Sequence, residues 1–553
     1  MYRVSARSQS IPHSTRVGDA AFSPEAHNTR RGMRRSGGLR GFGAAAMAAL
    51  FVASSLGTPT SRTPAFHANI DPSLRSGEVA LVHTTAGRAA ALAMKLAQAG
   101  AVDVETDAAA DTVIARLSGD ALAAIAHDRS VTVATRDLQV VATGGGKDRP
   151  GFEKDNAKDS ADKRSNGGRP SATSLASIHA PQAWQRSKGE DVTVAVMDTG
   201  IAEHPDLPKD KIRARVDFVN DGSKLQDPGG HGTFLAGVIA ADGELKGVAP
   251  DADLVSLRVL DANGVGTGVG VVRAFDWLLS HRAQYRIKVL NISWGAPQTS
   301  SYQTDLLSAL VESVWFSGIT VVVAAGNDGP DPHTVTTPGA DPFVITVGSL
   351  RDQGTADPSD DVESTFSSRG PTLDGFAKPD TLAPGEHIAG LRVKGLTYLG
   401  ADGSPIGSTS DRYIHMTGTS ASAASVSGIA ALVLAAHPRY TPTQVKGAIV
   451  ASGRPVAGST TKAVDASAAL TSMTAVNVGI APSRLLLSLL ARLHMLKGKG
   501  VTWEGVTWDG VTWDGVTWEG VTWDSVSWES VSWETVSWET VTWEGVTWGK
   551  VIQ

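Results

Sequence analysis

The segment VTVAVMDTG, residues 192–200, decides the fold of this chain. Its first six residues form an almost continuous apolar run, which ends on Asp198 and a glycine turn. Similar apolar runs follow at residues 254–259, 289–293, 319–324 and 344–347, with stretches of helical pattern between them. Continuous apolar strands that alternate with helices are typical of a parallel sheet covered on both faces. We therefore predict an α/β domain over residues 171–475, with a mainly parallel sheet and helices on both faces.

Four polar side chains stand where these strands and helices should begin or end. Asp198 follows the first apolar run, and Asn327 comes shortly after the fourth. In open α/β sheets, sites form beyond the carboxyl ends of the strands. His231 stands between a glycine-rich stretch and an apolar helical run, and Ser420 stands between the glycine of Gly418 and a long run of small residues. We expect these four side chains to meet in one site.

These residue types match the needs of acyl transfer. A serine hydroxyl needs an imidazole to take its proton and a carboxylate to orient that imidazole. Asp198, His231 and Ser420 supply one candidate for each role, and the carboxamide of Asn327 supplies a donor for an oxyanion. Each block alone has another interpretation. Asp-Thr-Gly also marks aspartic proteases, which need two such carboxylates where this chain has one copy, and Gly-Thr-Ser alone would be an ordinary helix cap.

Residues 175–460 resemble the catalytic domain of the subtilisin-like serine proteases, or subtilases. The motifs that carry the resemblance stand in family order and are VMDTGI (196–201), GHGT (230–233), NISWG (291–295), AGN (325–327), FSSRGP (366–371), KPD (378–380) and GTS (418–420). The resemblance implies that Ser420 attacks the scissile carbonyl, that His231 acts as general base and then acid, and that Asp198 orients it. Asn327 and the Ser420 N–H would hold the oxyanion.

The same resemblance implies a substrate-binding segment at Ser293, Trp294 and Gly295, which would pair with an extended protein or peptide substrate as a strand does. It implies no cofactor for the chemistry. It allows structural calcium, but assigns no metal ligand in this sequence. The predicted function is a secreted serine endopeptidase that is made as a self-processed zymogen and acts through an acyl-enzyme.

The sequence departs from the family pattern around the nucleophile. Phe234 stands where a second histidine is usual, Ala421 where methionine is usual, and Ala424 and Ser425 where the helix usually reads Pro-His. None of these changes removes a group that transfers protons, so we expect activity to survive. Residues 390–412 form an added loop that we expect to lie near the nucleophile.

The N-terminal third predicts a targeting segment and an inhibitor. Residues 1–68 contain an apolar run at 41–53 behind several arginines, which is typical of a signal peptide and too short to span a bilayer. Residues 69–143 alternate strand and helix patterns and predict a small α+β, ferredoxin-like layer, which the resemblance identifies as an inhibitory propeptide. Residues 144–170 are a polar linker, where we expect cleavage. The location would be secreted or at the cell surface, and the absence of cysteine excludes disulfides.

The C-terminal end is of a different kind. Residues 476–500 are an apolar and basic connector, either a helix docked on the large domain or one that binds a membrane surface or partner. Residues 501–553 hold ten pentapeptides of the type Val-Thr-Trp-Glu-Gly, with ten of the fourteen tryptophans. They would either stack as a solenoid of short strands or stay disordered until a partner binds.

The array of indoles makes cell-wall polymer, carbohydrate or another protein the expected ligand of these repeats. A nucleic acid is not expected, because the basic N-terminal end precedes an apolar stretch as a targeting signal does. The alternative to a protease is a catalytically weak, protease-like binding or adhesion protein that acts through the repeats. The intact Asp198, His231, Asn327 and Ser420 argue against that alternative.

Overall fold

The computed structural model describes the N-terminal layer, the large domain and the backbone of the C-terminal strands. The described residues are 69–71, 74–85, 87–107, 112–143, 152–153, 173–396, 410–474, 476–477, 479–483, 485–486 and the strands within 502–548. The expected signal segment, most of the linker and the middle of the loop at 390–412 lie outside the described residues.

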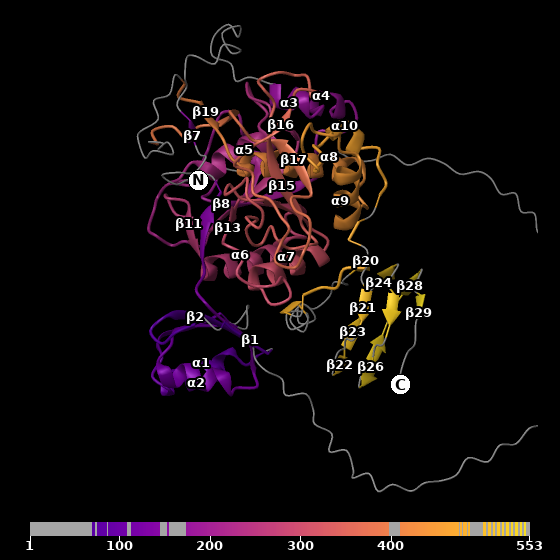
Figure 1. Ribbon diagram of the computed structural model, residues 1–553. Helices are drawn as coiled ribbons and strands as arrows, with labels where there is room; N and C mark the ends of the chain where they lie inside the picture. The colour runs from indigo at the N-terminus through magenta and orange to yellow at the C-terminus, as the bar shows by residue number, and fades with distance from the viewer. Residues whose placement is uncertain are drawn as a thin grey trace, which may run out of the picture. The chain divides into compact units, whose positions relative to one another are not determined.

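The N-terminal layer is a five-stranded sheet with two helices (Figure 1). Its elements are β1 (Asn69–Ile70), β2 (Val79–Thr84), α1 (Ala89–Gln98), β3 (Val102–Asp107), β4 (Thr112–Arg116), α2 (Gly119–Ala126) and β5 (Val131–Arg136). The strand order β1-β5-β2-β4-β3 contains the split βαβ arrangement of a ferredoxin-like layer. The sequence prediction missed β3, because this strand carries an exposed Val102 and three acids instead of an apolar run.

The large domain is built on an eight-stranded sheet. Its main path runs β16-β15-β14-β12-β8-β10-β9, and β17 also pairs with β15. The strands are β8 (Thr193–Asp198), β9 (Ile212–Asp217), β10 (Asp253–Arg258), β12 (Ile287–Ile292), β14 (Thr320–Ala324), β15 (Ile345–Arg351), β16 (Val362–Glu363) and β17 (Thr381–Pro384). All pairs are parallel except β15 with β16. The five apolar runs of the sequence are the five adjacent strands β10, β8, β12, β14 and β15, which confirms the predicted sheet.

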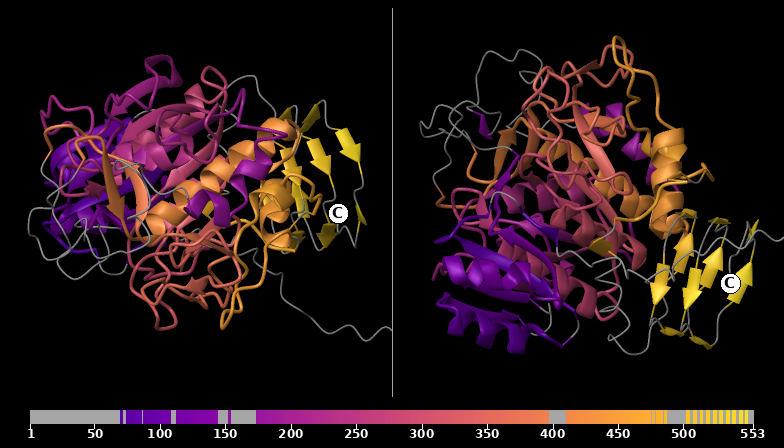
Figure 2. Two further views of the ribbon diagram at one scale, coloured as in Figure 1. Left: turned by 90° about the horizontal axis from the view of Figure 1, so that it is seen from above. Right: turned by 60° about the horizontal axis from the view of Figure 1, so that its bottom comes forward.

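Helices cover both faces of this sheet (Figures 1 and 2). The long ones are α5 (His231–Ala240), α6 (Gly268–His281), α7 (Leu306–Phe316), α8 (Thr419–Ala436) and α9 (Pro442–Ala451). Shorter ones are α3 (Thr173–Ser177), α4 (Ala180–Ala183), α10 (Ala466–Ala469) and the 3-10 helix η2 (Lys209–Lys211). Helix α8 packs against α5, β12, β14 and β15. It is the one described helix long and apolar enough to cross a membrane, yet it is buried within the core.

Four short strands lie at the periphery of the large domain. They are β11 (Val265–Thr267), β13 (Trp294–Gly295), β18 (Ile388–Leu391) and β19 (Tyr413–Met416). Two strands from before residue 171 pair with them: β6 (Gln139–Ala142) lies between β11 and β13, and β7 (Phe152–Glu153) pairs with β19. The chain that follows the N-terminal layer is therefore held by the large domain on both sides of residue 144.

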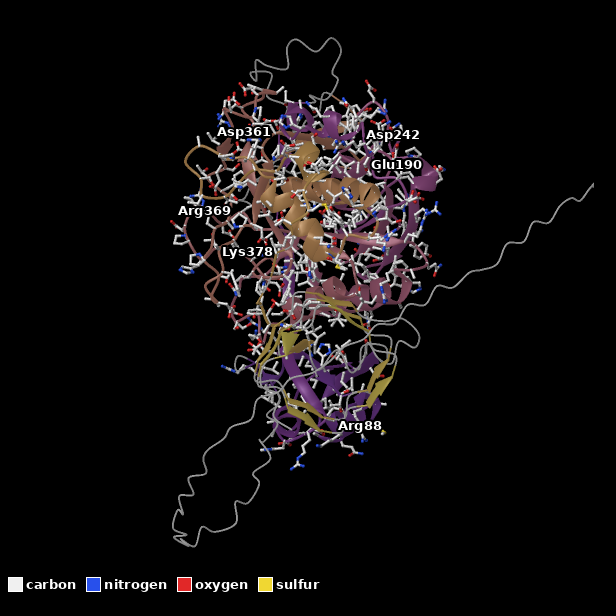
Figure 3. All side chains as sticks on the ribbon, turned by 90° about the vertical axis from the view of Figure 1, so that its right-hand side faces the viewer. Arg88, Glu190, Asp242, Asp361, Arg369 and Lys378 are labelled. Carbon is white, nitrogen blue, oxygen red and sulfur yellow. The ribbon has the colours of Figure 1, made fainter. Side chains whose placement is uncertain are left out.

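Some motif residues serve the core. Lys378, labelled in Figure 3, is buried, and its Nζ lies 2.7 Å from Asp380 Oδ2. The Nζ of Lys446 lies 3.0 Å from the other oxygen of the same carboxylate. Burial opposes the charge on Asp380, but the two ammonium groups outweigh it and hold the pKa of this carboxyl below its ordinary value. The Lys-Pro-Asp motif, which immediately precedes β17, therefore bonds to β15 through Thr346 and to α9 through Lys446.

The described part of the connector packs on the large domain. The Ser483 hydroxyl donates to Glu312 in α7 over 2.6 Å, and the Tyr302 hydroxyl donates to the Ala481 carbonyl over 2.9 Å. Leu485 and Leu486 are buried in the core of this domain. These contacts match the docked alternative for the connector over residues 481–483 and 485–486.

The C-terminal strands pair in parallel with a step of 20 residues. They are β20 (Thr502–Glu504), β21 (Thr507–Asp509), β22 (Thr512–Asp514), β23 (Thr517–Glu519), β24 (Thr522–Asp524), β25 (Ser527–Glu529), β26 (Ser532–Glu534), β27 (Ser537–Glu539), β28 (Thr542–Glu544) and β29 (Thr547–Trp548). Trp503 pairs with Trp523, which pairs with Trp543. Four pentapeptides therefore make one coil, and equivalent residues lie at one register position.

Candidate active site

Asp198 and His231 form a hydrogen-bonded pair at the edge of the sheet. Asp198 is the last residue of β8, His231 is the first residue of α5, and Nδ1 of the imidazole lies 2.8 Å from Oδ1 of the carboxylate. Both residues are buried. Burial opposes a charged imidazolium, but the charge and hydrogen bond of Asp198 and the charge of Asp227 outweigh it and raise the pKa of His231. This arrangement suits a general base whose cation is stabilised.

Asp227, which the sequence prediction missed, shapes the turn into α5. Its buried carboxylate accepts hydrogen bonds from Gly230 N over 2.6 Å and from Thr233 N over 2.7 Å. Burial raises the pKa of Asp227. A side chain on Gly232 could not be accommodated, because its Cβ would lie 2.1 Å from the Gly200 carbonyl oxygen. The sequence signal that could have identified Asp227 is its position three residues before Gly230, the glycine at the start of the helix.

Asn327 is oriented by the residue before the nucleophile. The backbone N–H and the hydroxyl of Thr419 donate to Asn327 Oδ1 over 3.0 and 2.9 Å. The amide nitrogen therefore faces the other way, where Nδ2 donates to the carbonyl oxygen of Thr143 over 2.7 Å. Ser420, buried at the start of α8, places its Oγ 2.7 Å from that same oxygen. The predicted nucleophile and oxyanion donor thus converge on one carbonyl group.

The chain that supplies this carbonyl lies in the cleft as a strand. β6 runs antiparallel to β11 and to β13, with Val141 opposite Val265 and Ala142 opposite Trp294. One residue further on, Thr143 N donates to the Ser293 carbonyl oxygen over 2.9 Å. The structure therefore places the predicted segment Ser293 to Gly295 beside an extended chain. The second side of the cleft, β11, was missed because its three residues are too short to show a strand pattern.

Only the backbone of the predicted substrate segment faces the cleft strand. The Trp294 ring is buried, and its Nε1 donates to the Met197 carbonyl oxygen over 2.9 Å. The Ser293 hydroxyl donates to the Ser420 carbonyl oxygen over 3.3 Å. Gly295 lies against Thr336, where an added Cβ would come within 2.4 Å of the threonine hydroxyl. These three residues therefore pack on the side of the segment that faces away from the cleft strand.

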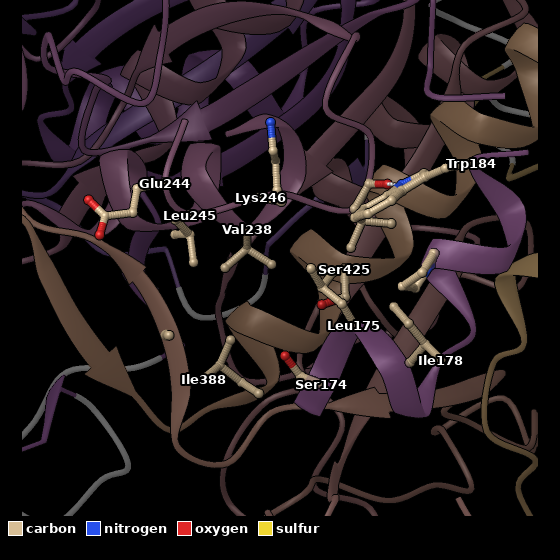
Figure 4. Close-up of a pocket in the computed structure, with 13 residues that line it drawn as sticks. Ser174, Leu175, Ile178, Trp184, Val238, Glu244, Leu245, Lys246, Ile388 and Ser425 are labelled. Atoms are coloured by element: carbon tan, nitrogen blue, oxygen red, sulfur yellow. Dashed lines mark hydrogen bonds between the residues drawn. The ribbon is translucent and has the colours of Figure 1, made fainter. Parts of the chain in front are cut away.

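Two cavities lie near these residues. One, of about 970 Å³, begins beside Thr143 and is lined by Gly295, Gly326 and neighbouring residues. The other, of about 200 Å³, lies behind the nucleophile helix and is lined mainly by apolar side chains, with Ser425 of α8 and Val238 of α5 among them (Figure 4). The second cavity borders Ser425, which stands where the family pattern usually has a histidine.

The described residues offer no site to which calcium can be assigned. Among them there is no group of three or more His, Cys, Asp and Glu side chains that could hold a metal ion. The buried carboxylate of Asp206 already bonds to the Arg412 guanidinium, to the Tyr413 hydroxyl and to Leu245 N. Its charge is thereby balanced by arginine. Structural calcium stays a prediction without ligands.

Comparison with known proteins decides the family. The model of the subtilase family, Peptidase_S8, matches residues 189–470, which contain Asp198, His231, Asn327 and Ser420. The chain belongs to the subtilase family. This subtilase is 41% identical over 274 residues to the serine protease AprX of Bacillus subtilis (strain 168), covering 47% of this chain and 61% of that protein. It is also 34% identical over 280 residues to subtilisin from Bacillus pumilus, covering 87% of that protein.

A solved structure shows the same fold. Fervidolysin from Fervidobacterium pennivorans, described as a keratinolytic enzyme related to subtilisin, aligns with a TM-score of 0.57 and 23% identity. The alignment covers 75% of this subtilase and 64% of fervidolysin. The chain thus spans about three fifths of the length of AprX and of fervidolysin. The predicted family and α/β fold are confirmed. The N-terminal layer and the C-terminal repeats lie outside the residues that the family model matches.

Proposed function

We propose that this subtilase is a serine endopeptidase that is made as a zymogen and cuts its own chain between Thr143 and Gly144. The observation that carries the proposal is the Thr143 carbonyl oxygen, which lies 2.7 Å from Ser420 Oγ and 2.7 Å from Asn327 Nδ2. A nucleophile and an oxyanion donor on one carbonyl group are what acyl transfer requires.

The proposed steps assign to Asp198, His231, Asn327 and Ser420 the roles that acyl transfer requires. Ser420 Oγ attacks the carbonyl carbon of Thr143 while His231 takes the hydroxyl proton, and the charge on Asp198 stabilises the resulting imidazolium. The negative charge that develops on the Thr143 oxygen is held by Asn327 Nδ2 and the Ser420 N–H. The C–N bond breaks, and His231 returns the proton to the Gly144 amine. Water then hydrolyses the ester between Thr143 and Ser420.

The same contacts support inhibition by the N-terminal layer after cleavage. β6 stays paired on both sides, and Thr143, the residue that follows it, covers the nucleophile, so a second substrate cannot enter until the layer leaves or is degraded. Other proteins or peptides would then occupy the place of β6. The apolar run at 41–53 supports export, and a cell-wall, carbohydrate or protein ligand of the repeats stays a prediction.

The test is self-cleavage of the full chain and of its Ser420→Ala variant. We expect the wild type to yield a product whose N-terminus is Gly144 and to react with a serine-directed fluorophosphonate. Ser420→Ala should stay full length and unlabelled. Ser422→Ala is the matched control, because Ser422 is buried in the same helix and bonds to the Pro384 carbonyl instead of the cleft strand. A wild type that remains intact and unlabelled would contradict the proposal.

A further inference from the structure

The C-terminal strands form coils of four strands, and the described strands end half-way round a coil. Residues 20 apart pair in register, so β20 pairs with β24, and β24 pairs with β28. The next side of the coil also stacks three strands, which are β21, β25 and β29. The remaining two sides stack two strands each, β22 with β26 and β23 with β27. Ten strands at four to a coil therefore make two and a half coils.

Each end of this module presents four strand edges. Among the described strands, β20 to β23 at the first coil pair on one side only, as do β26 to β29 at the other end. Such an edge is a template for another strand, and natural proteins usually blunt it with proline, lysine or a bulge. Residues 501–548 contain neither proline nor lysine, and the pairings of these strands show no shift of register. The edges are therefore suited to a further strand of the same kind.

The first pentapeptide does not differ from the internal ones. Solenoids usually end on atypical repeats, which cap the stack of coils. Residues 501–505 read VTWEG, and the same five residues stand at 516–520 and 541–545 within the module. The first coil therefore offers the same backbone pairing positions as an internal coil and carries no capping sequence of its own.

We propose that a second copy of the chain stacks the first coil of its repeats on the last coil of the first copy, so that the two modules continue one solenoid. A strand that fits these edges has to repeat the same kinds of residue every five and every 20 positions, and within this chain only residues 501–548 do so. The two surfaces in contact differ from each other, so the arrangement can add further copies. The proposal concerns the repeats alone and is independent of the protease.

The half coil determines the register between the two copies. Each strand pairs with the strand four places further along the chain, so the strand that continues the stack after β29 belongs on the edge of β26. In the proposed contact, β20 of the second copy takes this place, and its Thr502 stands opposite Ser532 of the first copy. Each added copy is therefore turned by half a coil about the axis of the solenoid.

Tryptophans favour this contact. Trp503 pairs with Trp523, which pairs with Trp543, and the same residue type stands at the middle of every strand pair. The junction adds one tryptophan pair on each of its four edges. In parallel strands that pair in register, stacked aromatic residues stabilise the ladder. The junction should therefore gain the same stabilisation as the contact between two coils of one chain.

Acids oppose the contact and make it sensitive to salt. Glu504 pairs with Asp524, so acids of neighbouring coils already share one register position. In the proposed contact, Glu504 of the second copy stands opposite Glu534. Like charges directly opposite each other are destabilising, and residues 501–553 hold nine acids and one lysine. Because salt screens this repulsion, the contact should strengthen as the salt concentration rises.

The first test is sedimentation of the full chain carrying Ser420→Ala, which prevents self-cleavage. We expect association that depends on protein concentration and increases from about 0.05 to 0.5 M salt. Deletion of residues 501–553 should leave a monomer. Thr502→Pro with Thr507→Pro blocks the first coil, so this variant should not associate with itself but should bind the unblocked chain through its last coil. Thr502→Ser with Thr507→Ser is the matched control, because the repeats already carry serine at Ser527.

The second test examines the register by cross-linking. The chain has no cysteine, so single cysteines can be introduced without competition. Neighbouring strands lie about 5 Å apart, within reach of a short bis-maleimide. A mixture of Thr502→Cys chains and Ser532→Cys chains should give a covalent dimer. Ser537→Cys is the matched control for Ser532→Cys, because Ser537 lies in β27, on the next side of the coil, and its yield with Thr502→Cys should be at least about fivefold lower.

Three outcomes would overturn the proposal. The first is a monomer under all conditions, and the second is association that survives deletion of residues 501–553. The third is cross-linking that is as strong with Ser537→Cys as with Ser532→Cys, or that joins two Thr502→Cys chains to each other, because either result would show that the first coil does not stack on the last coil in this register.

Discussion

The large domain and the N-terminal layer differ in the size and composition of their hydrophobic cores. The large domain has an extensive core around five adjacent parallel strands. The core of the layer consists of fourteen buried apolar residues, of which six are alanines. Because the stabilisation from burial scales with apolar area, an alanine-rich core of this size supplies little. The difference predicts that the large domain is stable by itself, whereas the layer has a small core and, under the proposed function, depends on its contacts with the cleft.

The largest expected effect comes from a substitution that removes catalysis in the large domain and leaves the layer unchanged. Asp198→Asn keeps the size of the side chain but removes the charge that orients His231 and stabilises its cation. We expect kcat of the processed enzyme to fall by about 10⁴-fold, by analogy with the same change in chymotrypsin-like proteases. Binding of the separate layer should be unchanged, because the buried Asp198 carboxylate bonds to Thr199 N and to His231 and not to β6. Loss of binding together with activity would mean that the two functions are not separable.

The acidic limb of the pH profile tests the electrostatics of the same pair. The general base must be neutral, so activity falls as pH drops through the pKa of His231. Because Asp198 and Asp227 raise that pKa despite burial, the midpoint of kcat/KM should lie above the ordinary value of 6.5. Asp227→Asn removes one of the two charges and should move the midpoint to lower pH. A wild-type midpoint below 6.5 would show that burial dominates.

A substitution in the core of the layer should weaken inhibition and leave catalysis unchanged. Leu96 of α1 is fully buried, and Leu96→Ala should lower the free energy of unfolding of the layer by about 2–4 kcal/mol, through lost transfer energy and the cavity left behind. The separate layer should then inhibit the processed enzyme more weakly, by roughly tenfold or more, while kcat is unaffected. Met94→Ala in the same helix is the control, because Met94 is 64% exposed. The idea of a marginal layer fails if inhibition by Leu96→Ala equals that of the control.

The sequence predicted most of the large domain but less of the layer. Continuous apolar runs gave all five central strands, since a strand buried on both faces must be apolar throughout. The sequence did not predict β3, because it is an exposed edge strand, or β11, because it has only three residues. The candidate residues Asp198, His231, Asn327 and Ser420 were selected from their position at strand and helix ends, and their roles stay a proposal. Thr143 was not, because its role arises from the pairing of β6 with β11 and β13, and no local pattern reports a contact with Ser420 across the sequence.

The smallest expected effect concerns Asp137, where the layer contacts helix α6. Its carboxylate accepts a hydrogen bond from Val269 N over 3.3 Å at the N-terminus of this helix. Burial outweighs the backbone hydrogen bonds and raises the pKa of Asp137, so the negative charge contributes little to binding at neutral pH and the acceptor oxygen contributes more. Asp137→Asn keeps an acceptor and should leave the inhibition constant within about twofold. Asp137→Ala leaves the helix N-terminus without this acceptor and should weaken inhibition by about fivefold to tenfold. Titration of the separate layer against processed enzyme measures both variants. If Asp137→Asn weakens inhibition as much as Asp137→Ala, then the charge at the helix N-terminus holds the layer in place.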